Sequence, residues 1–372
     1  MKINSKDISI VPLISGDRGV SVLDVLIFHK FKIPKVILGK KEDLDLFKDK
    51  KYKNLEIIFQ DNINDKSFVD SLYNLQFDYL IMSGFRQILK KNILNTPKKG
   101  TINLHAGKLP EYRGGSPLNW QMINGEEYAY ISTILTDLGI DTGNILIEKR
   151  FEITMNDDIK SLHIKANNLF PEMVIDSIGM IEKGNKGKKQ DEKNACYWHQ
   201  RNDDDGYIDF KTSTSSLVVR TIRAITTPYP CAWGIVNGDK VRIIKAERLN
   251  FKLGGTPGKV VILNDHTPLV VCSEGAIKIL DYKFQAIWVF EIAARFPFIM
   301  KYLKNYQLIS EFVLSTILDN YFLHFAGGGA DAKVWLQPKL LKKINKKLIS
   351  EFQSYYDKKL QGKKIYKRRR RA

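Results

Sequence analysis

Residues 78–105 read DYLIMSGFRQILKKNILNTPKKGTINLH, and this stretch decides the fold. It holds two short apolar runs, at 78–84 and 100–105, which predict buried β-strands. Ser83 and Gly84 close the first run, and Asn103 and His105 close the second. Because ligands of open α/β sheets bind at the carboxyl ends of the strands, we expect a functional site at these two ends.

The pattern repeats outward from this stretch. Apolar runs that predict further strands lie at 8–14, 35–39, 55–60, 128–137 and 144–153. Segments with helical spacing of apolar residues lie at 20–31, 66–75, 117–125 and 160–180. Strands that alternate with helices favour parallel pairing. The sequence therefore predicts an α/β domain with a doubly wound, Rossmann-like sheet.

Changes in composition divide the rest of the chain. A charged, aperiodic stretch suits a linker, Gly-punctuated strands around an Asn237-Gly238 turn predict a small β-rich, OB-like domain, and the last part is helical and basic. We predict a catalytic domain at 1–182, a linker at 183–196 and a β-rich domain at 197–284. A helical extension with a basic tail is predicted at 285–372.

Bulk properties exclude several classes of protein. The sequence contains no run of about 18 apolar residues, so it predicts no membrane span. Cys196, Cys231 and Cys272 are few and widely spaced, which predicts reduced core residues of a cytoplasmic protein and no metal site. The net charge is +18, but residues 331–372 hold 15 Lys/Arg and 3 Asp/Glu, so residues 1–330 carry only +6.

Three polar residues stand out, two of them within residues 78–105 and one after them. Asn103 and His105 are two residues apart and so share one face of their strand, and Asp141 lies in a Gly-Ile-Asp-Thr-Gly turn 38 residues after Asn103. Each residue alone fits a structural role. Together they can move a proton and stabilise an oxyanion without a metal.

The motifs Asn-x-His, Leu-Pro-x-Tyr-Arg-Gly and Asp-Thr-Gly at this spacing resemble the folate-dependent formyltransferase family. The family's catalytic Asn, His and Asp fall on Asn103, His105 and Asp141. The pattern departs at Ala106–Pro110, where the family usually has a Ser-Leu-Leu-Pro-like sequence, so acceptor contacts there are expected to differ.

The resemblance implies a reaction and a donor. A primary amine attacks the formyl carbon of 10-formyltetrahydrofolate, Asn103 and His105 donate hydrogen bonds to the oxyanion, and Asp141 orients His105 and helps to remove the amine proton. Residues implied to contact this cofactor are Ser83, Gly84, Phe85, Arg86, Ile88, Leu89, Leu138, Gly139 and Ile140. For residues 83–85 the alternative is a plain turn between a strand and a helix.

The second domain resembles that of methionyl-tRNA and sugar-nucleotide formyltransferases, which disfavours the glycinamide ribonucleotide enzymes. The tRNA enzymes carry a basic insertion after their second strand, whereas residues 39–54 here are short and of mixed charge. We therefore expect a nucleotide-linked amino sugar, with dTDP favoured, of the kind used for surface polysaccharide. Methionyl-tRNA formyltransferase is the alternative, and an inactive nucleic-acid-binding module is a third.

Candidate acceptor-binding residues lie near the motif and after the linker. Rings suit stacking on a base, and cations suit a diphosphate. These candidates are Lys108, Tyr112, Arg113, Tyr197, Trp198, His199 and Arg201. Packing between domains is the alternative for Tyr197 and Trp198. Asp203–Asp205 fits a solvated turn better than a metal site.

The basic tail at 331–372 leaves the partners open. A basic amphipathic helix suits the inner, anionic face of a membrane or an RNA, and a solvated tail is the plainer interpretation. A homodimer through the helical extension also stays open. A small-molecule nucleotide sugar is the expected acceptor partner.

Overall fold

The computed structural model describes residues 5–236, 239–262 and 267–284. The chain divides into two compact units, residues 1–285 and 286–372, and every described residue belongs to the first. The predicted helical extension and basic tail at 285–372, and the Asn237-Gly238 turn, lie outside the described residues.

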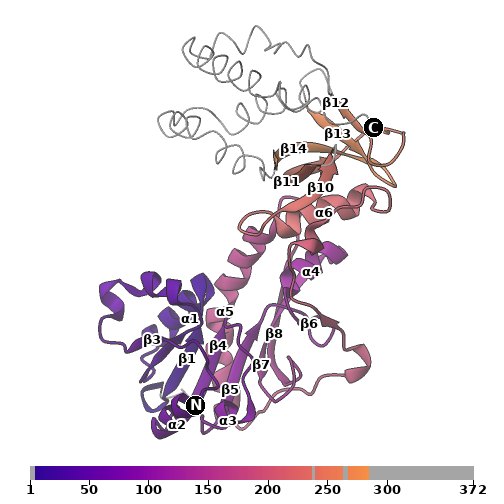
Figure 1. The fold of residues 1–372 in the computed structure, drawn as a ribbon. Coiled ribbons are helices and arrows are strands. Elements are labelled where there is room, and N and C mark those ends of the chain that lie inside the picture. Colours follow the sequence, from indigo (N-terminus) through magenta and orange to yellow (C-terminus); the bar gives the residue numbers. More distant parts are fainter. Residues whose placement is uncertain (1–4, 237–238, 263–266, 285–372) are drawn as a thin grey trace, which may run out of the picture. The chain divides into compact units, whose positions relative to one another are not determined.

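A seven-stranded sheet forms the core of the first of the two domains in this unit (Figure 1), in the order β3-β2-β1-β4-β5-β7-β8. Its strands are β1 (Ile10–Ile14), β2 (Val36–Leu38), β3 (Ile57–Phe59), β4 (Tyr79–Ser83), β5 (Gly100–His105), β7 (Tyr128–Leu135) and β8 (Asn144–Glu152). The first five strands in the sheet order pair in parallel, and β7 and β8 add on antiparallel. The predicted doubly wound α/β class is confirmed.

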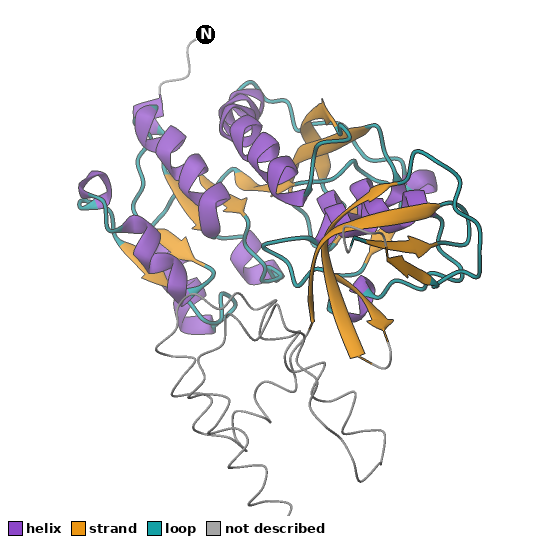
Figure 2. Cartoon of the chain, turned by 90° about the horizontal axis from the view of Figure 1, so that it is seen from above, coloured by secondary structure: helices purple, strands orange, loops and turns teal. Residues whose placement is uncertain are grey.

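Helices lie on both sides of this sheet, as Figure 2 shows. They are α1 (Gly16–Phe28), α2 (Lys66–Asn74), α3 (Lys91–Leu94), α4 (Pro117–Asn124) and α5 (Ile159–Glu182). Side chains of α1, α4 and α5 share one buried cluster with alternate strand residues, and α2 and α3 share another. Asp158 caps α5 by accepting a hydrogen bond from the Ser161 backbone N–H, as its position before the helix favours.

Alternation along β5 leaves one face for polar side chains. Ile102 and Leu104 belong to the buried cluster that includes α5. Because successive strand side chains point to opposite faces, Asn103 and His105 project from the other face. In the register Ser83 lies opposite Leu104, so the carboxyl ends of β4 and β5 are level.

The second domain is a helix and a five-stranded antiparallel sheet in the order β10-β11-β14-β13-β12. Its elements are α6 (Ser215–Ile225), β10 (Ala232–Val236), β11 (Asp239–Arg248), β12 (Val260–Ile262), β13 (Pro268–Val271) and β14 (Ala276–Phe284). The β-rich character predicted for this region is confirmed. Helix α6 packs against both α4 and β11, and so joins the two domains.

The sequence missed one pairing between distant segments. Two-residue strands β6 (Arg113–Gly114) and β9 (Tyr197–Trp198) pair in parallel. Short 3-10 turns η2 (Lys41–Phe47), η3 (Lys50–Tyr52), η4 (Glu192–Asn194) and η5 (Asp204–Gly206) were also not predicted. The β6–β9 pair ties the segment after the predicted linker to the catalytic motif.

Two bulk expectations meet the structure differently. All three cysteines are free thiols, but only Cys272 is buried, and Cys196 is exposed. The expectation that all three are core residues is therefore wrong for Cys196, which lies beside the short strand β9. Among the described helices, none is long and apolar enough to cross a membrane.

Candidate active site

The polar side chains of β5 meet the loop between β7 and β8. Asn103 Nδ2 donates a hydrogen bond of 3.2 Å to Asp141 Oδ1, and His105 Nδ1 lies 3.4 Å from Asp141 Oδ2. His105 is buried, whereas Asn103 and Asp141 are partly exposed. The structure thus brings together the three residues that the motif singled out. The group can hold a proton and stabilise negative charge on an oxygen atom.

A second contact fixes the orientation of the imidazole. His105 Nε2 lies 2.6 Å from the backbone oxygen of Tyr112. Because a carbonyl oxygen only accepts, this geometry assigns a hydrogen to Nε2. Nδ1 then faces Asp141 and is the ring nitrogen left for chemistry. It donates a hydrogen bond only when the ring carries a second proton.

The Asp141 loop is held by two groups outside the trio. The backbone N–H of Gly114 donates to Asp141 Oδ2 at 2.9 Å. Gln190 Nε2 donates to the backbone oxygens of Asp141 and Gly143, at 2.8 and 2.7 Å. These bonds hold Asp141 at φ 54°, a left-handed conformation that costs a non-glycine residue about 1 kcal/mol or more.

Two glycines of the motif make room for this geometry. A Cβ on Gly107 would lie 2.6 Å from His105 Nε2. Gly114 has φ 93°, and a Cβ there would lie 2.3 Å from the backbone oxygen of Trp198. A side chain at either position would therefore push apart the segments that hold His105 and Asp141.

Arg113 is fully buried and serves the loop that carries Asp141. It donates to Glu192 at 2.7 and 2.9 Å, to Gln190 Oε1 at 2.9 and 3.0 Å and to the Tyr197 hydroxyl at 2.9 Å. The hydrogen bonds to Glu192 raise the pKa of Arg113. All five of its N–H groups are used within the chain. The guanidinium therefore supports Gln190 and has no N–H group left for the substrate that accepts the formyl group.

The aromatic candidates separate into packed and exposed rings. Trp198 stacks on Tyr112, with centroids 5.5 Å apart, and contacts Trp120 at 4.9 Å. Its Nε1 donates to the backbone oxygen of Glu111. Tyr197 lies on the other side of β9, with its ring under Arg113. Trp198 therefore packs the interior of the motif loop, the alternative that we kept open for it.

The basic candidates separate in the same way. Lys108 pairs with Glu111 at 2.7 Å, and that hydrogen bond raises its pKa. His199 is exposed and pairs with Asp205 at 2.7 Å. Arg201 lies over the Trp120 ring, 5.0 Å from its centroid, and its backbone N–H donates to Ser116 Oγ. Of these, only Arg201 has a buried nitrogen, Nη1, without a partner among the described residues.

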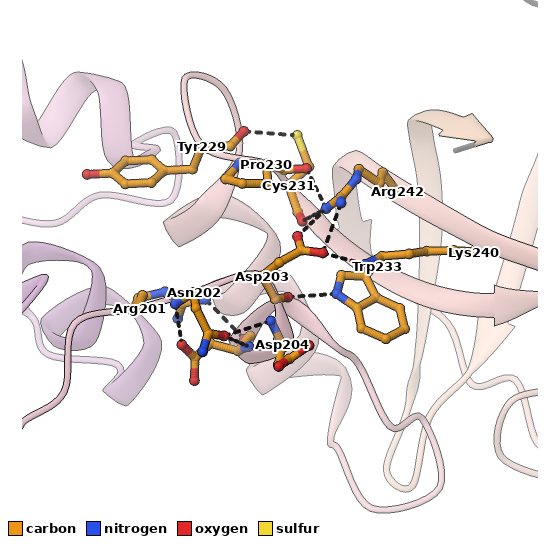
Figure 3. Close-up of polar contacts among 11 residues, drawn as sticks. Arg201, Asn202, Asp203, Asp204, Tyr229, Pro230, Cys231, Trp233, Lys240 and Arg242 are labelled. Carbon is orange, nitrogen blue, oxygen red and sulfur yellow. Dashed lines mark hydrogen bonds and ion pairs between the residues drawn. The ribbon is translucent and has the colours of Figure 1, made fainter. Parts of the chain in front are cut away.

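Asp203 anchors the segment that carries Arg201, as Figure 3 shows. Its carboxylate pairs with Lys240 and with Arg242, 2.7 Å away, and its backbone oxygen accepts a hydrogen bond from Trp233 Nε1. The hydrogen bonds to Arg242, followed by those to Lys240, lower the pKa of Asp203 to about 2. The three consecutive aspartates therefore begin with a structural ion pair. Within the described residues, no cluster of His, Cys, Asp and Glu could hold a metal ion.

The residues proposed for the donor form two loops with exposed apolar side chains. Ile88 is 68% exposed, Leu138 65% and Ile140 51%. Exposed large apolar side chains on two loops of one site suit a flat aromatic ligand. Leu89 instead belongs to the buried cluster with α2 and α3.

The loop after β4 is held in place by its neighbours. Asn64 Nδ2 donates to the backbone oxygen of Ile88, and Gln87 Oε1 accepts from the backbone N–H of Ile63. Ser83 is buried, and its backbone oxygen accepts from the Ser15 backbone N–H at 3.0 Å. Gly84 has a left-handed backbone and Arg86 is exposed. Gly139 lies against Thr142 in the other loop.

Sequence reasoning missed Gln190, whose side-chain amide donates to two backbone oxygens of the Asp141 loop. Gln190 is buried and sits inside the predicted linker. The charged residues around it masked any sign of its role, and no motif marks it. The backbone groups of Gly114 and Tyr112 were also missed, because a backbone contact leaves no trace in residue type.

Comparisons with known proteins agree with this geometry. The chain matches the family Formyl transferase over residues 2–178, and Formyl transferase, C-terminal domain, over residues 201–290. The methionyl-tRNA formyltransferase of Thermodesulfovibrio yellowstonii is 34% identical over 220 residues, which cover 59% of this chain and 70% of that protein. The chain therefore belongs to the formyl transferase family and is an N-formyltransferase.

Solved structures share the fold. WlaRD, a sugar 3N-formyl transferase crystallised with dTDP and 5-N-formyl-THF, superposes with a TM-score of 0.57 at 22% identity, over 75% of this chain and 98% of that one. The Helicobacter canadensis N-formyltransferase, in complex with folinic acid and dTDP-3-aminofucose, also has a TM-score of 0.57, at 20% identity, over 73% and 98%. These related proteins bind folate derivatives.

Proposed function

We propose that this enzyme transfers a formyl group from 10-formyltetrahydrofolate to the primary amine of a nucleotide-linked amino-dideoxy sugar, with dTDP as the favoured nucleotide. The observation that carries the choice of acceptor is the segment after β2. Residues 40–54 form the short turns η2 and η3, and Phe47 and Tyr52 bury their rings on the catalytic domain. This segment holds no basic arm of the kind that the resemblance associates with tRNA.

The same segment is tied to α1. The Tyr52 hydroxyl donates to Asp24 Oδ1 at 2.7 Å, and Lys51 Nζ pairs with Asp24 Oδ2 at 2.8 Å. The charge of the segment is mixed, with six Lys against four Asp/Glu between residues 40 and 54. Polyanion binding depends on an excess of cations, so this surface favours a small acceptor over an RNA.

The exposed apolar loops fit the donor. Ile88, Leu138 and Ile140 would contact the flat pterin ring, and the Asp141 loop would place the reactive end near the trio. The donor supplies, when bound, a formyl group whose carbon is open to attack by an amine. Everything else in the reaction falls to side chains of this enzyme.

In the proposed reaction Asn103 Nδ2 and His105 Nδ1, which both face Asp141 in the structure, would donate to the formyl oxygen. Each such donor is worth about 2.7–4 kcal/mol where negative charge develops on oxygen. For Nδ1 to donate, both ring nitrogens of His105 must carry a hydrogen, because Nε2 is already committed to the Tyr112 backbone. Asp141 Oδ2 lies 3.4 Å from Nδ1.

Asp141 also serves the acceptor. An amine attacks only as the neutral base and must lose a proton once the new bond forms. The Asp141 carboxylate is partly exposed and has no Lys or Arg partner among the ion pairs of the described chain. It can therefore accept the amine proton, directly or through water.

Methionyl-tRNA remains a second candidate because a relative that is 34% identical carries the name methionyl-tRNA formyltransferase. The test compares kcat/KM of the full chain for three acceptors, with 10-formyltetrahydrofolate as the donor. The acceptors are dTDP-4-amino-4,6-dideoxyglucose, dTDP-3-aminofucose and methionine-charged initiator tRNA. We expect kcat/KM for one amino sugar to exceed that for the tRNA by about 100-fold or more. Turnover with the tRNA alone would refute the proposal.

A further inference from the structure

Three small residues lie side by side at the carboxyl ends of neighbouring strands. Strand β1 lies between β2 and β4, and Ile14 at its end pairs with the last residue of each of them. The three strands therefore end level with one another. The next residues along the chain are Ser15 after β1, Gly39 after β2 and Gly84 after β4.

Hydrogen bonds fix Ser15 in the middle of this row. Its backbone N–H donates to the backbone oxygen of Ser83 at 3.0 Å. The N–H of the next residue, Gly16, donates to Asp43 Oδ2 in the segment after β2, at 3.1 Å. Moving Ser15 would therefore break its bonds to the segments on both sides.

Gly39 has no room for a side chain. A Cβ at this position would lie 2.6 Å from Ser15 Oγ and 3.0 and 3.2 Å from two ring carbons of Phe85. Carbon atoms pack at about 3.5–4.0 Å, so both contacts with the ring would be too close. The Ser15 hydroxyl can rotate away, but the Phe85 ring packs against the buried cluster of α2 and α3. The ring is therefore the neighbour that a side chain would displace.

The need for glycine at position 39 is steric and not conformational. The backbone of Gly39 lies outside the left-handed region, so an alanine there would meet no backbone strain. Its N–H donates to the Ile14 oxygen at 3.1 Å, a bond that alanine also makes. Gly84 differs, because its φ is 70° and a Cβ there would lie 2.8 Å from the Ser15 backbone oxygen. A change at Gly39 thus isolates the contact with Phe85.

Phe85 lies at the near end of the loop that is implied to contact the donor. Asn64 holds the far end of that loop, since its Oδ1 accepts from the Lys90 N–H and its Nδ2 donates to the Ile88 oxygen. With the far end fixed, the place of the Phe85 ring decides the course of the near half, residues 84–86. Whatever sets the position of this ring therefore sets that half of the loop.

We propose that Gly39 is a positioning residue for the formyl donor. By leaving room for the Phe85 ring at the end of β2, it keeps residues 84–86 in the course that binds the pterin ring of a tetrahydrofolate. The identity of the donor rests on the proposed function. The steric contact between Gly39 and Phe85 does not.

The test is calorimetric titration of the full chain with 5-formyltetrahydrofolate, which shares the pterin ring of the donor. Gly39→Ala should weaken its binding by about tenfold, because an added methyl group in a packed place forces its neighbours to shift. With the acceptor that turns over, KM for the donor should rise by a similar factor, and kcat should change by less than about threefold. Gly254→Ala is the matched control and should bind as the wild type does, because a Cβ on this exposed glycine would meet no described atom within 4 Å.

Phe85→Ala separates a contact with the ring from a general loss of stability. Without the ring there is no clash, so adding Gly39→Ala to Phe85→Ala should change neither the affinity for 5-formyltetrahydrofolate nor the melting temperature. The melting temperature also serves as the readout if either single variant folds poorly.

Unchanged affinity in Gly39→Ala, even with a lower melting temperature, would overturn the inference. A loss of equal size in the presence and absence of the Phe85 ring would overturn it too. No binding of 5-formyltetrahydrofolate by the wild type would refute the proposed donor and the inference together. A loss that depends on Phe85 in an enzyme that formylates no amino sugar would refute the proposed acceptor and leave the role of Gly39 standing.

Discussion

Asp141 and Asp203 both hold a loop in place, but with different partners. Asp203 pairs with Lys240 and Arg242, so its charge is neutralised by permanent cations. Asp141 contacts an amide, a backbone N–H and an imidazole, none of which carries a fixed charge. The difference teaches which carboxylate is already committed to permanent cations. The hydrogen bonds to Arg242 and Lys240 lower the pKa of Asp203, whereas the partners of Asp141 leave its carboxylate available to an incoming amine.

The largest effect is expected at the reactive member of this pair. Asp141→Asn keeps the size of the side chain but removes the proton acceptor, and its NH2 replaces one of the two oxygens that accept from Asn103 Nδ2 and from the Gly114 N–H. We expect the single-turnover rate of formyl transfer to fall by about 1,000-fold, with binding of the donor unchanged. A rate within about tenfold of wild type would show that Asp141 moves no proton.

The amide of the trio comes next. Asn103→Leu has a similar volume and donates no hydrogen bond. The rate should fall by about 100-fold, because one donor to the developing negative charge is lost. The measurement is kcat at saturating donor and acceptor. A change in KM alone would show that Asn103 contributes to binding and not to the reaction.

Gln190 tests whether the loop of Asp141 must be held. Gln190→Glu keeps an acceptor for Arg113 but loses the two N–H donors to the loop backbone. We expect kcat to fall by about tenfold through misplacement of Asp141. If Gln190 does not position the loop, Gln190→Glu and Asp141→Asn will have independent effects on kcat in the double variant. Coupled effects are the expected result.

The smallest effect on rate is expected at Asp203. Asp203→Asn should change formyl transfer by less than about threefold and lower stability by about 1 kcal/mol, a figure reduced for the exposure of the pair. Because the pKa of Asp203 is lowered from 3.8 to about 2 in the folded state, its contribution is present above about pH 4 and is lost as the pH falls toward 2.

Melting temperatures of wild type and Asp203→Asn between pH 6 and pH 3 test that sign. The gap between the two proteins should be constant from pH 6 to pH 5 and should narrow below pH 4. A gap that widens as the pH falls would contradict the ion pair with Lys240 and Arg242. Asp204→Asn, which changes a neighbour without an ion pair in the described structure, serves as the control.

The sequence predicted the parts of the molecule that follow from local pattern. Apolar runs placed the strands of the sheet, and the spacing of Asn103, His105 and Asp141 placed the site. It did not predict contacts made through the backbone or across long separations. Gln190 reaches its targets from 47 and 49 residues away, and β6 pairs with β9 across the linker. Such pairs are decided by tertiary packing, which no local periodicity encodes.

Residue type alone also gave a wrong role for a buried arginine. Arg113 was expected to meet an anionic ligand, but all of its N–H groups serve Glu192, Gln190 and Tyr197. Arg18 carried no motif and was not singled out, although its Nε donates to Asn167 and its Nη2 lies 3.3 Å from His163 Nδ1. In both cases the use of each N–H group, and not the presence of an arginine, indicates the role.

The most direct test of the account is the mass of dTDP-3-aminofucose or dTDP-4-amino-4,6-dideoxyglucose after incubation with 10-formyltetrahydrofolate and the full chain, with Asp141→Asn and Asp203→Asn in parallel. The account predicts that one amino sugar gains a formyl group with the wild type and with Asp203→Asn, and that Asp141→Asn gives almost no product in the same time. Equal product from Asp141→Asn and Asp203→Asn would contradict it.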